Sequence, residues 1–165
     1  MNKKQIFYFG FFLATLIGLQ SCGCAKDVVD EKPIEGTTEA TKIAFKNSAR
    51  GYLTGNGGEK IPEGGMVINS QLNWDELTAK MNSVNNEIQG ESIDFSKQTV
   101  LAYFDQIRGS GGYTVEFASM SQINNSIQAV VKQTDSDGND IEIMTQPYSI
   151  VIIDKTENKV EFIKQ

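Results

Sequence analysis

Acidic side chains supply most of the residues in this chain that could do chemistry, because the sequence contains no histidine. A missing imidazole excludes Ser-His-Asp and Cys-His nucleophilic sites and removes the commonest zinc ligand. A pair of closely spaced carboxylates would still support glycoside hydrolysis. The acidic residues expected on strands are Asp105, Glu116, Glu142 and Asp154. Their spacing does not distinguish a catalytic pair from solvent-facing residues, so a carboxylate-based hydrolase is the least favoured hypothesis.

The acidic segment at residues 135–140 partly matches a calcium-binding loop. Asp135, Asp137 and Asn139 occupy the first, third and fifth positions of such a loop. An aspartate stands at position six, where the loop needs glycine, and a glutamine stands at position twelve, where it needs a bidentate glutamate. A solvated hairpin tip explains the same residues. The sequence therefore predicts no metal and no other cofactor.

A glycine-rich turn at residues 108–113 follows an expected strand, which is also where phosphate-binding loops occur. Such a loop needs a helix after it to present backbone amides, and here an alternating strand follows. We therefore interpret the glycines as a tight bend between two strands. They are Gly109, Gly111 and Gly112.

The same bend leaves a cation and an aromatic ring near one end of the expected sheet. With two further aromatic residues they form a candidate binding surface. Its members are Arg108, Tyr113, Trp74 and Tyr148.

Hydrophobic periodicity predicts one principal amphipathic helix. Asn73 can cap its first turn, and Glu76 can reach back to complete a capping box. Apolar residues then recur at spacings of three and four on one face, which we expect to pack against a sheet. They are Trp74, Leu77, Met81 and Val84.

The rest of the chain is rich in strand patterns. Short strands are expected at 42–46 and 66–69, separated by an irregular loop at 51–65 that contains six glycines. The segment 99–107 is apolar on both faces, as in a central strand.

Further strands are expected at 113–117, 127–133, 141–145, 148–153 and 159–164. The polar turn after the second of these predicts a hairpin between 127–133 and 141–145. Pro147 lacks a backbone donor and should lie at the start of its strand or on an edge. One helix followed by a run of strands predicts an α+β fold with a mainly antiparallel sheet.

The first 21 residues have the order of a secretory signal peptide. Lys3 and Lys4 precede an apolar run at residues 6–19, whose 14 residues are too few to span a bilayer. The run ends in LQSC at residues 19–22, which resembles a bacterial lipobox with Cys22 as the acylated first residue of the mature chain. The glutamine departs from the commonest pattern, and the alternative is an ordinary signal peptide with a chance cysteine.

The mature chain should consist of a lipidated N-terminus and flexible tether at residues 22–41 and a single domain at 42–165. Removing the signal takes away two lysines and no acidic residue, which changes the net charge from −6 to −8. This charge disfavours nucleic acids and anionic lipid surfaces, so the expected membrane contact is the lipid. Cys24 is then the only other thiol, and no intramolecular disulfide can form.

The expected location is the bacterial cell envelope, at the outer membrane. Charged residues soon after Cys22 are similar to signals that export lipoproteins to the cell surface, and they equally suit a soluble linker. The sequence leaves the periplasmic face and the cell surface open.

From about residue 73 the pattern resembles the C-terminal domain of the protease-complex subunit PrcB family. The resemblance rests on the helix led by Trp74, the hydrophobic strand at 100–107, the Gly-Gly-Tyr turn ending at Tyr113, and the Pro147-Tyr148 strand. It implies a small non-catalytic envelope domain, which in the name-giving case accompanies a secreted protease complex.

Three functional hypotheses follow. The first is a lipid-anchored, non-enzymatic module that binds another envelope protein, such as a secreted protease. The second is a periplasmic or surface protein that binds a small molecule or glycan, with the loop at 51–65 and Trp74 or Tyr113 as stacking surfaces. The third is the carboxylate-based hydrolase.

The lipobox makes a direct prediction about Cys22. In a bacterial host fed labelled palmitate, we expect Cys22→Ser to abolish label incorporation and to release the protein from the membrane fraction, because the acylated thiol is gone. The matched variant Cys24→Ser should stay labelled and membrane-bound. Label retained by Cys22→Ser would contradict the assignment.

Overall fold

The computed structural model describes residues 39–165 except 87, 137 and 139–141. The predicted signal peptide, Cys22, Cys24 and the tether up to residue 38 lie outside the described residues, as does part of the acidic segment at 135–140. Within the described ranges, no helix is both long and apolar enough to cross a membrane.

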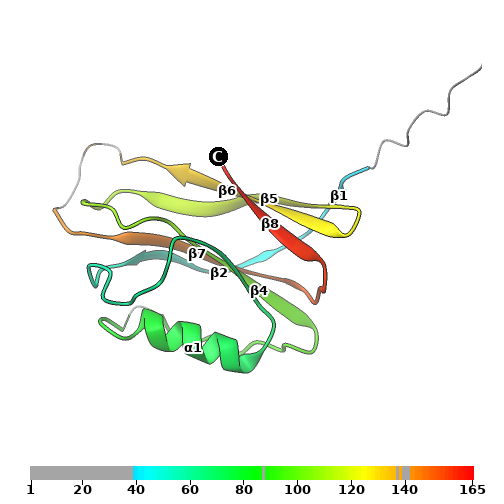
Figure 1. The fold of residues 1–165 in the computed structure, drawn as a ribbon, viewed down its shortest axis with the longest axis horizontal. Helices are drawn as coiled ribbons and strands as arrows, with labels where there is room; N and C mark the ends of the chain where they lie inside the picture. Colours follow the sequence, from blue (N-terminus) through cyan, green and yellow to red (C-terminus); the bar gives the residue numbers. More distant parts are fainter. Residues whose placement is uncertain (1–38, 87, 137, 139–141) are drawn as a thin grey trace, which may run out of the picture. The chain divides into compact units, whose positions relative to one another are not determined.

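Eight strands in the described residues form two four-stranded sheets (Figure 1). The first sheet contains, in spatial order, β1 (Thr41–Lys42), β5 (Thr114–Ile123), β6 (Ser126–Thr134) and β8 (Lys159–Lys164). The second contains β2 (Lys46–Leu53), β7 (Gln146–Asp154), β4 (Gln98–Phe104) and β3 (Gly64–Ile68). Neighbouring strands are antiparallel except β6 and β8, which are parallel. With the single helix α1 (Gln71–Met81), this arrangement confirms the predicted α+β class.

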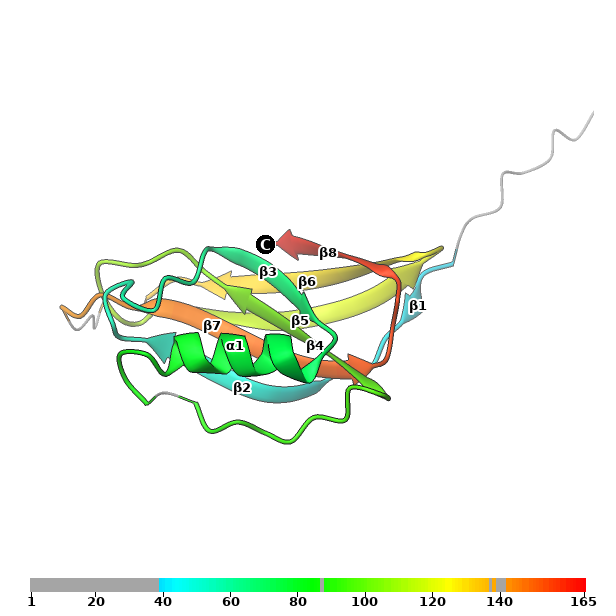
Figure 2. The same cartoon turned by 60° about the horizontal axis from the view of Figure 1, so that its bottom comes forward.

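The second sheet lies between α1 and the first sheet and is buried on both faces (Figures 1 and 2). Along β4, the side chains of Val100, Ala102 and Phe104 join the core beneath α1. Leu101 and Tyr103 point the other way and join the core between the sheets. Because successive side chains in a strand alternate between faces, a strand with two buried faces must be apolar throughout. The prediction of a central strand at 99–107 is therefore confirmed for β4.

Helix α1 begins two residues before the predicted cap. Ser70 has extended backbone angles, and its Oγ accepts a hydrogen bond from the backbone N–H of Asn73 at 3.3 Å. Asn73 therefore lies inside the helix, and the prediction that it is the cap is wrong. The predicted stripe is buried at Trp74, Leu77 and Met81. Val84 follows the end of the helix and is 49% exposed, because the stripe stops where the helix does.

The strand predicted at 42–46 is instead the junction between the two sheets. Its first residue ends β1 and its last begins β2, while residues 43–45 belong to neither strand. Ile43 and Phe45 still alternate inward, against the core between the sheets. The backbone N–H of Ile43 donates to the carbonyl of Met120 at 3.0 Å. The alternation correctly marked the buried face but not the change of sheet.

The hairpin predicted between 127–133 and 141–145 is not formed. β6 pairs with β5 and β8, and the described residues 142–144 are not in a strand. The chain instead crosses to the second sheet, where Pro147 is the second residue of β7, as its missing donor predicts. The loop predicted at 51–65 is shorter than expected, because β2 runs to Leu53 and β3 starts at Gly64.

The revised cap can be tested by two alanine substitutions. We expect Ser70→Ala to lower the free energy of unfolding by about 1 kcal/mol, because the helix loses the acceptor for one of its free N–H groups. Asn73→Ala should have a much smaller effect, because only the backbone of Asn73 makes the capping bond. Chemical denaturation of both variants measures the difference, and a larger loss in Asn73→Ala would contradict the cap.

Candidate functional site

A buried ionic cluster lies just beyond the end of β4. Asp105 is 0% exposed at its side chain, and its Oδ2 accepts hydrogen bonds from Nε and Nη2 of Arg108 at 2.9 and 2.6 Å. Its Oδ1 accepts from Nζ of Lys164, in β8, at 2.8 Å. Lys164 also pairs with Glu63 at 3.3 Å, just before β3. The cluster therefore ties together the ends of strands from both sheets.

The charges of this cluster stabilise one another. Burial raises the pKa of Asp105, but hydrogen bonds from Lys164, Arg108 and the backbone N–H of Gln106 more than offset it, so the pKa falls below the ordinary aspartate value. The hydrogen bond with Asp105 raises the pKa of Lys164 despite its partial burial. Asp105 is therefore ionised at neutral pH with both oxygens occupied. A carboxylate in this state is a poor general acid or base.

Arg108 and Tyr113, two members of the candidate binding surface, lie against each other. The guanidinium carbon of Arg108 is 4.6 Å from the centre of the Tyr113 ring, a cation–π contact. The glycine turn between them connects β4 of one sheet to β5 of the other, and Gly112 has φ +88°, which glycine adopts without strain. Arg108 also exchanges two backbone hydrogen bonds with Thr145, at 2.7 and 3.0 Å.

The other two members of the candidate surface lie in the core. Trp74 is buried between α1 and the second sheet, and Tyr148 packs beside Phe104 with ring centres 6.0 Å apart. Both rings are covered by apolar neighbours, so neither presents a face to solvent. Aromatic residues with helical or strand periodicity fill the core here. Periodicity alone does not distinguish an aromatic residue of the core from one of a binding surface.

Loops from both sheets meet at one end of the fold, beside Arg108 and Tyr113. The loops β2–β3, β4–β5 and the described part of β6–β7 all lie at the left of Figure 1. The Arg108–Thr145 bridge holds the last two together. Three large apolar side chains are exposed on these loops, namely Ile107, Ile143 and Met144. We call this set, with Arg108 and Tyr113, the loop-end surface.

The glycine-rich loop between β2 and β3 folds around a carboxylate. Glu59 is 2% exposed, and its Oε1 accepts a hydrogen bond from the backbone N–H of Gly55 at 2.8 Å. The carbonyl of Ile61, in the same loop, accepts from Nε2 of Gln146 at 3.0 Å. These contacts order the loop from within. Most residues of the loop are nevertheless exposed or half-buried.

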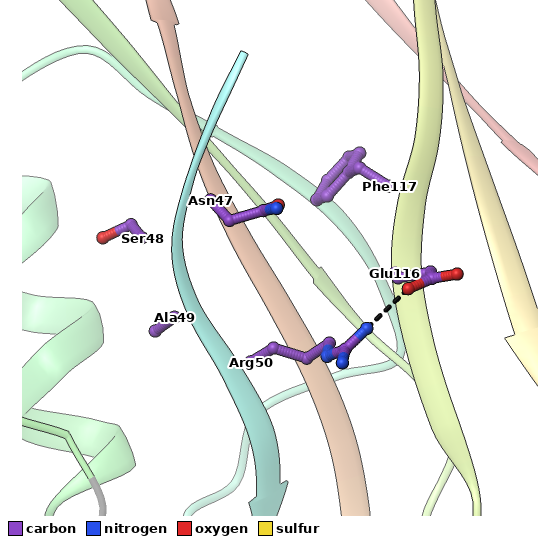
Figure 3. A pocket seen from close by; sticks show the side chains of 6 residues that line it. All are labelled: Asn47, Ser48, Ala49, Arg50, Glu116 and Phe117. Carbon is purple, nitrogen blue, oxygen red and sulfur yellow. Dashed lines mark hydrogen bonds and ion pairs between the residues drawn. The ribbon is translucent and has the colours of Figure 1, made fainter.

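A polar hollow of about 280 Å³ lies between the edges of β2 and β5 (Figure 3). Its lining residues are Asn47, Ser48, Ala49, Arg50, Glu116 and Phe117. The side chains of Arg50 and Glu116 point toward each other across it and form an ion pair. Neither charge is buried, and the pair spans the two sheets.

The predicted strand carboxylates do not gather into a site. Asp105 is held by Arg108 and Lys164, and Glu116 by Arg50, so each is set against cations. Asp154 is exposed at the end of β7. Glu142 is exposed too and lies outside the strands, so its predicted place on a strand is wrong. Among the described residues, no group of three or more acidic or cysteine side chains could hold a metal ion.

Lys164 and Glu63 belong to the ionic cluster, although no sequence pattern singled them out. Lys164 lies 59 residues from Asp105, and it appears in the sequence as one charged residue of an alternating terminal strand. No local spacing connects the two residues. The parallel pairing of β8 with β6 brings them together.

Comparison with protein-family models, with curated proteins and with solved structures finds no match for this chain. The resemblance to the PrcB C-terminal domain therefore stays a prediction from the sequence.

The ionic cluster predicts a pH-dependent stability. Asp105→Asn should lower the free energy of unfolding by roughly 2–4 kcal/mol at pH 7, because two cations lose a buried partner. The folded pKa of Asp105 lies below its unfolded value. Its contribution is therefore complete above about pH 4 and is lost as the pH falls through that value toward the folded pKa. The free energies of unfolding of wild type and variant, measured by chemical denaturation, should accordingly converge below pH 4.

A surface carboxylate provides the matched control. Glu91 pairs with Lys46 and Ser48, and hydrogen bonds from these residues also lower its pKa. Because Lys46 is exposed, Glu91→Gln should change the free energy of unfolding by less than about 1 kcal/mol. The role of the cluster would be overturned if both variants lost the same free energy of unfolding. It would also be overturned if the difference between wild type and Asp105→Asn did not change with pH.

Proposed function

We propose that this protein is a lipid-anchored, non-enzymatic module of the bacterial envelope that binds another envelope protein and holds it near the membrane. The loop-end surface is the observation that supports this function best. It combines exposed Ile107, Ile143 and Met144 with the Arg108–Tyr113 pair, on loops that the core holds in place. Aromatic residues, methionine and arginine are enriched in protein interfaces.

The ionic cluster beneath this surface gives it a rigid base. Asp105 holds Arg108 by hydrogen bonds, and the ring of Tyr113 lies against the guanidinium. Arg108 is only 15% exposed at its side chain, so few of its rotamers remain free. A partner that docks here would lose little side-chain entropy from Arg108, which favours binding. Asp105 is therefore a positioning residue in this proposal.

The envelope location rests on the sequence. The lipobox ending at Cys22 supports a lipid anchor, and the polar segment behind it supports a tether that keeps the domain near the outer membrane. The PrcB-like pattern adds a secreted protease complex as one setting for the partner. A diffusible role would need neither the anchor nor the tether.

The polar hollow of Figure 3 favours a second candidate function, the binding of a small molecule or glycan. It offers the amide of Asn47 and the Arg50–Glu116 ion pair around about 280 Å³, close to the lower end of ligand-pocket sizes. It ranks second because Trp74, one of the two predicted stacking residues, is buried.

The proposal predicts that a partner depends on the loop-end surface. After cross-linking and detergent solubilisation of membranes, the wild-type chain should repeatedly recover one protein partner. The double substitution Ile143→Glu with Met144→Glu should reduce recovery at least tenfold, because it places two charges in an apolar contact. Quantitative mass spectrometry of the recovered material measures the ratio.

Leu72→Glu is the control, because Leu72 is 68% exposed on α1, away from the loop-end surface. It should recover the partner as well as wild type does. Failure of the wild-type chain to recover any partner would sink the proposal. A thermal shift with a glycan, lost in Arg50→Ala, would then favour the second candidate.

A further inference from the structure

Each sheet edge that is left open can pair with another chain, and three of the four edges formed by the described strands are protected. Natural proteins blunt edges with charged residues, bulges or very short strands. β1 has two residues and covers only the end of β5, whose remaining edge carries Glu116 and a bulge. β8 carries Lys159, Glu161 and Lys164, and β2 carries Lys46, Arg50 and a bulge. β3 has none of these features, since its sequence is GGMVI and its pairing with β4 is regular.

The register shows which backbone groups β3 leaves open. The N–H of Asp105 donates to Pro147 in β7, so odd-numbered residues of β4 bond toward β7 and even-numbered ones toward β3. The even residues of β4 oppose Gly64, Met66 and Ile68. The N–H and C=O groups of Gly65 and Val67 therefore point outward. In the described part of the chain, β3 has no backbone ladder other than that with β4.

A groove lined by residues of β3 and α1 lies beside this edge. It encloses about 210 Å³, and its lining mixes apolar side chains with the polar ones of Asn73, Glu76 and Lys80. Met66 and Ile68 form its β3 side and Leu77 lies on its α1 side, while Glu76 and Lys80 bring one charge of each sign. Side chains directly opposite each other on paired strands lie on the same face. A residue paired opposite Met66 would therefore point into this groove.

On the other face of β3, Phe162 of β8 lies against Gly65. A Cβ on Gly65 would clash with the ring of Phe162, so the strand can approach β8 this closely only with glycine at this position. Phe162 in turn packs on Tyr103, with ring centres 6.2 Å apart. Val67 lies on the same face as Gly65 and is 39% exposed, so β8 covers this face only at Gly65.

We propose that β3 accepts an extended segment of a partner protein as an added strand, with one apolar side chain of that segment in the groove opposite Met66. This inference rests on the proposed protein-binding function and adds the form of the partner. Main-chain bonds to Gly65 and Val67 give affinity, and the groove selects the side chain.

A partner segment suits this edge better than a second copy of the chain. Five residues make an edge about 17 Å long, and a sheet edge is about 10 Å tall, so two paired copies would bury on the order of 350 Å² there. A stable interface buries roughly 1,200 Å² or more. A partner that also docks on the loop-end surface does not need the edge to supply the whole interface.

The test uses peptides and the full-length chain. The probes are nine-residue polythreonine peptides whose central residue is Leu, Phe, Asp or Gly. We expect the Leu and Phe peptides to bind at least fivefold more tightly than the other two. They should shift the amide NMR signals of Gly65 and Val67. Equal binding by all four, or signal changes confined to other residues, would overturn the proposal.

Val67→Pro removes one outward N–H without touching the ladder to β4, and we expect it to weaken peptide binding at least tenfold. Tyr52→Pro is the matched control, because the β2–β7 register places the N–H of Tyr52 outward on the opposite edge of the same sheet. It should bind as wild type does. Circular dichroism confirms that both variants fold, and equal loss in both would overturn the proposal.

The outcomes separate this inference from the proposed function. Loss of peptide binding at β3, with membrane partner recovery still dependent on Ile143 and Met144, would sink only the added strand. Peptide binding at β3 without any recoverable partner would sink only the proposed function. A dimer that Val67→Pro dissociates, seen by light scattering without peptide binding, would show that a second copy occupies the edge.

Discussion

The burial of the second sheet on both faces is the constraint on which the rest of this structure depends. Its two inner strands, β4 and β7, send alternate side chains into separate cores, one beneath α1 and one against the first sheet. Burial of apolar surface is the main favourable term in folding, and here each inner strand contributes it twice. The helix and the first sheet must each cover one face. The positions at which these strands and the helix end determine where the connecting loops lie.

The burial of the second sheet also determines the structure of the loop that follows β4. Asp105 follows the last apolar residue of β4 and is still fully buried, so its charge must be compensated within the protein. Arg108 and Lys164 supply the opposite charge from a loop and from β8. The cluster thus fixes the position of the glycine turn and of Tyr113. The loop-end surface is ordered because a buried charge beneath it requires partners.

The same layering determines which edges of the sandwich stay open. On one side, Arg50 and Glu116 join the edges of the two sheets with a salt bridge. On the other, Phe162 packs over Gly65 of β3 but leaves the backbone edge of that strand uncovered. The absence of charge in β3 contrasts with the lysines in β8 and β2. A protein-binding role would use two features that a purely structural account leaves without a purpose, the exposed apolar loops and this unprotected edge.

The sequence by itself determined which segments are buried and on which face. It identified the two-sided apolar pattern of β4, the buried face of α1 at Trp74, Leu77 and Met81, and the position of Pro147 near the start of β7. These features are local, because alternation and helical spacing directly record which side chains avoid water. Only the tertiary structure decided which strands pair and which charges meet. The predicted hairpin after β6 failed, and Lys164 reached Asp105 across 59 residues, because pairing depends on how two layers fit over a third. That fit is a property of the whole chain, and no short window of sequence contains it.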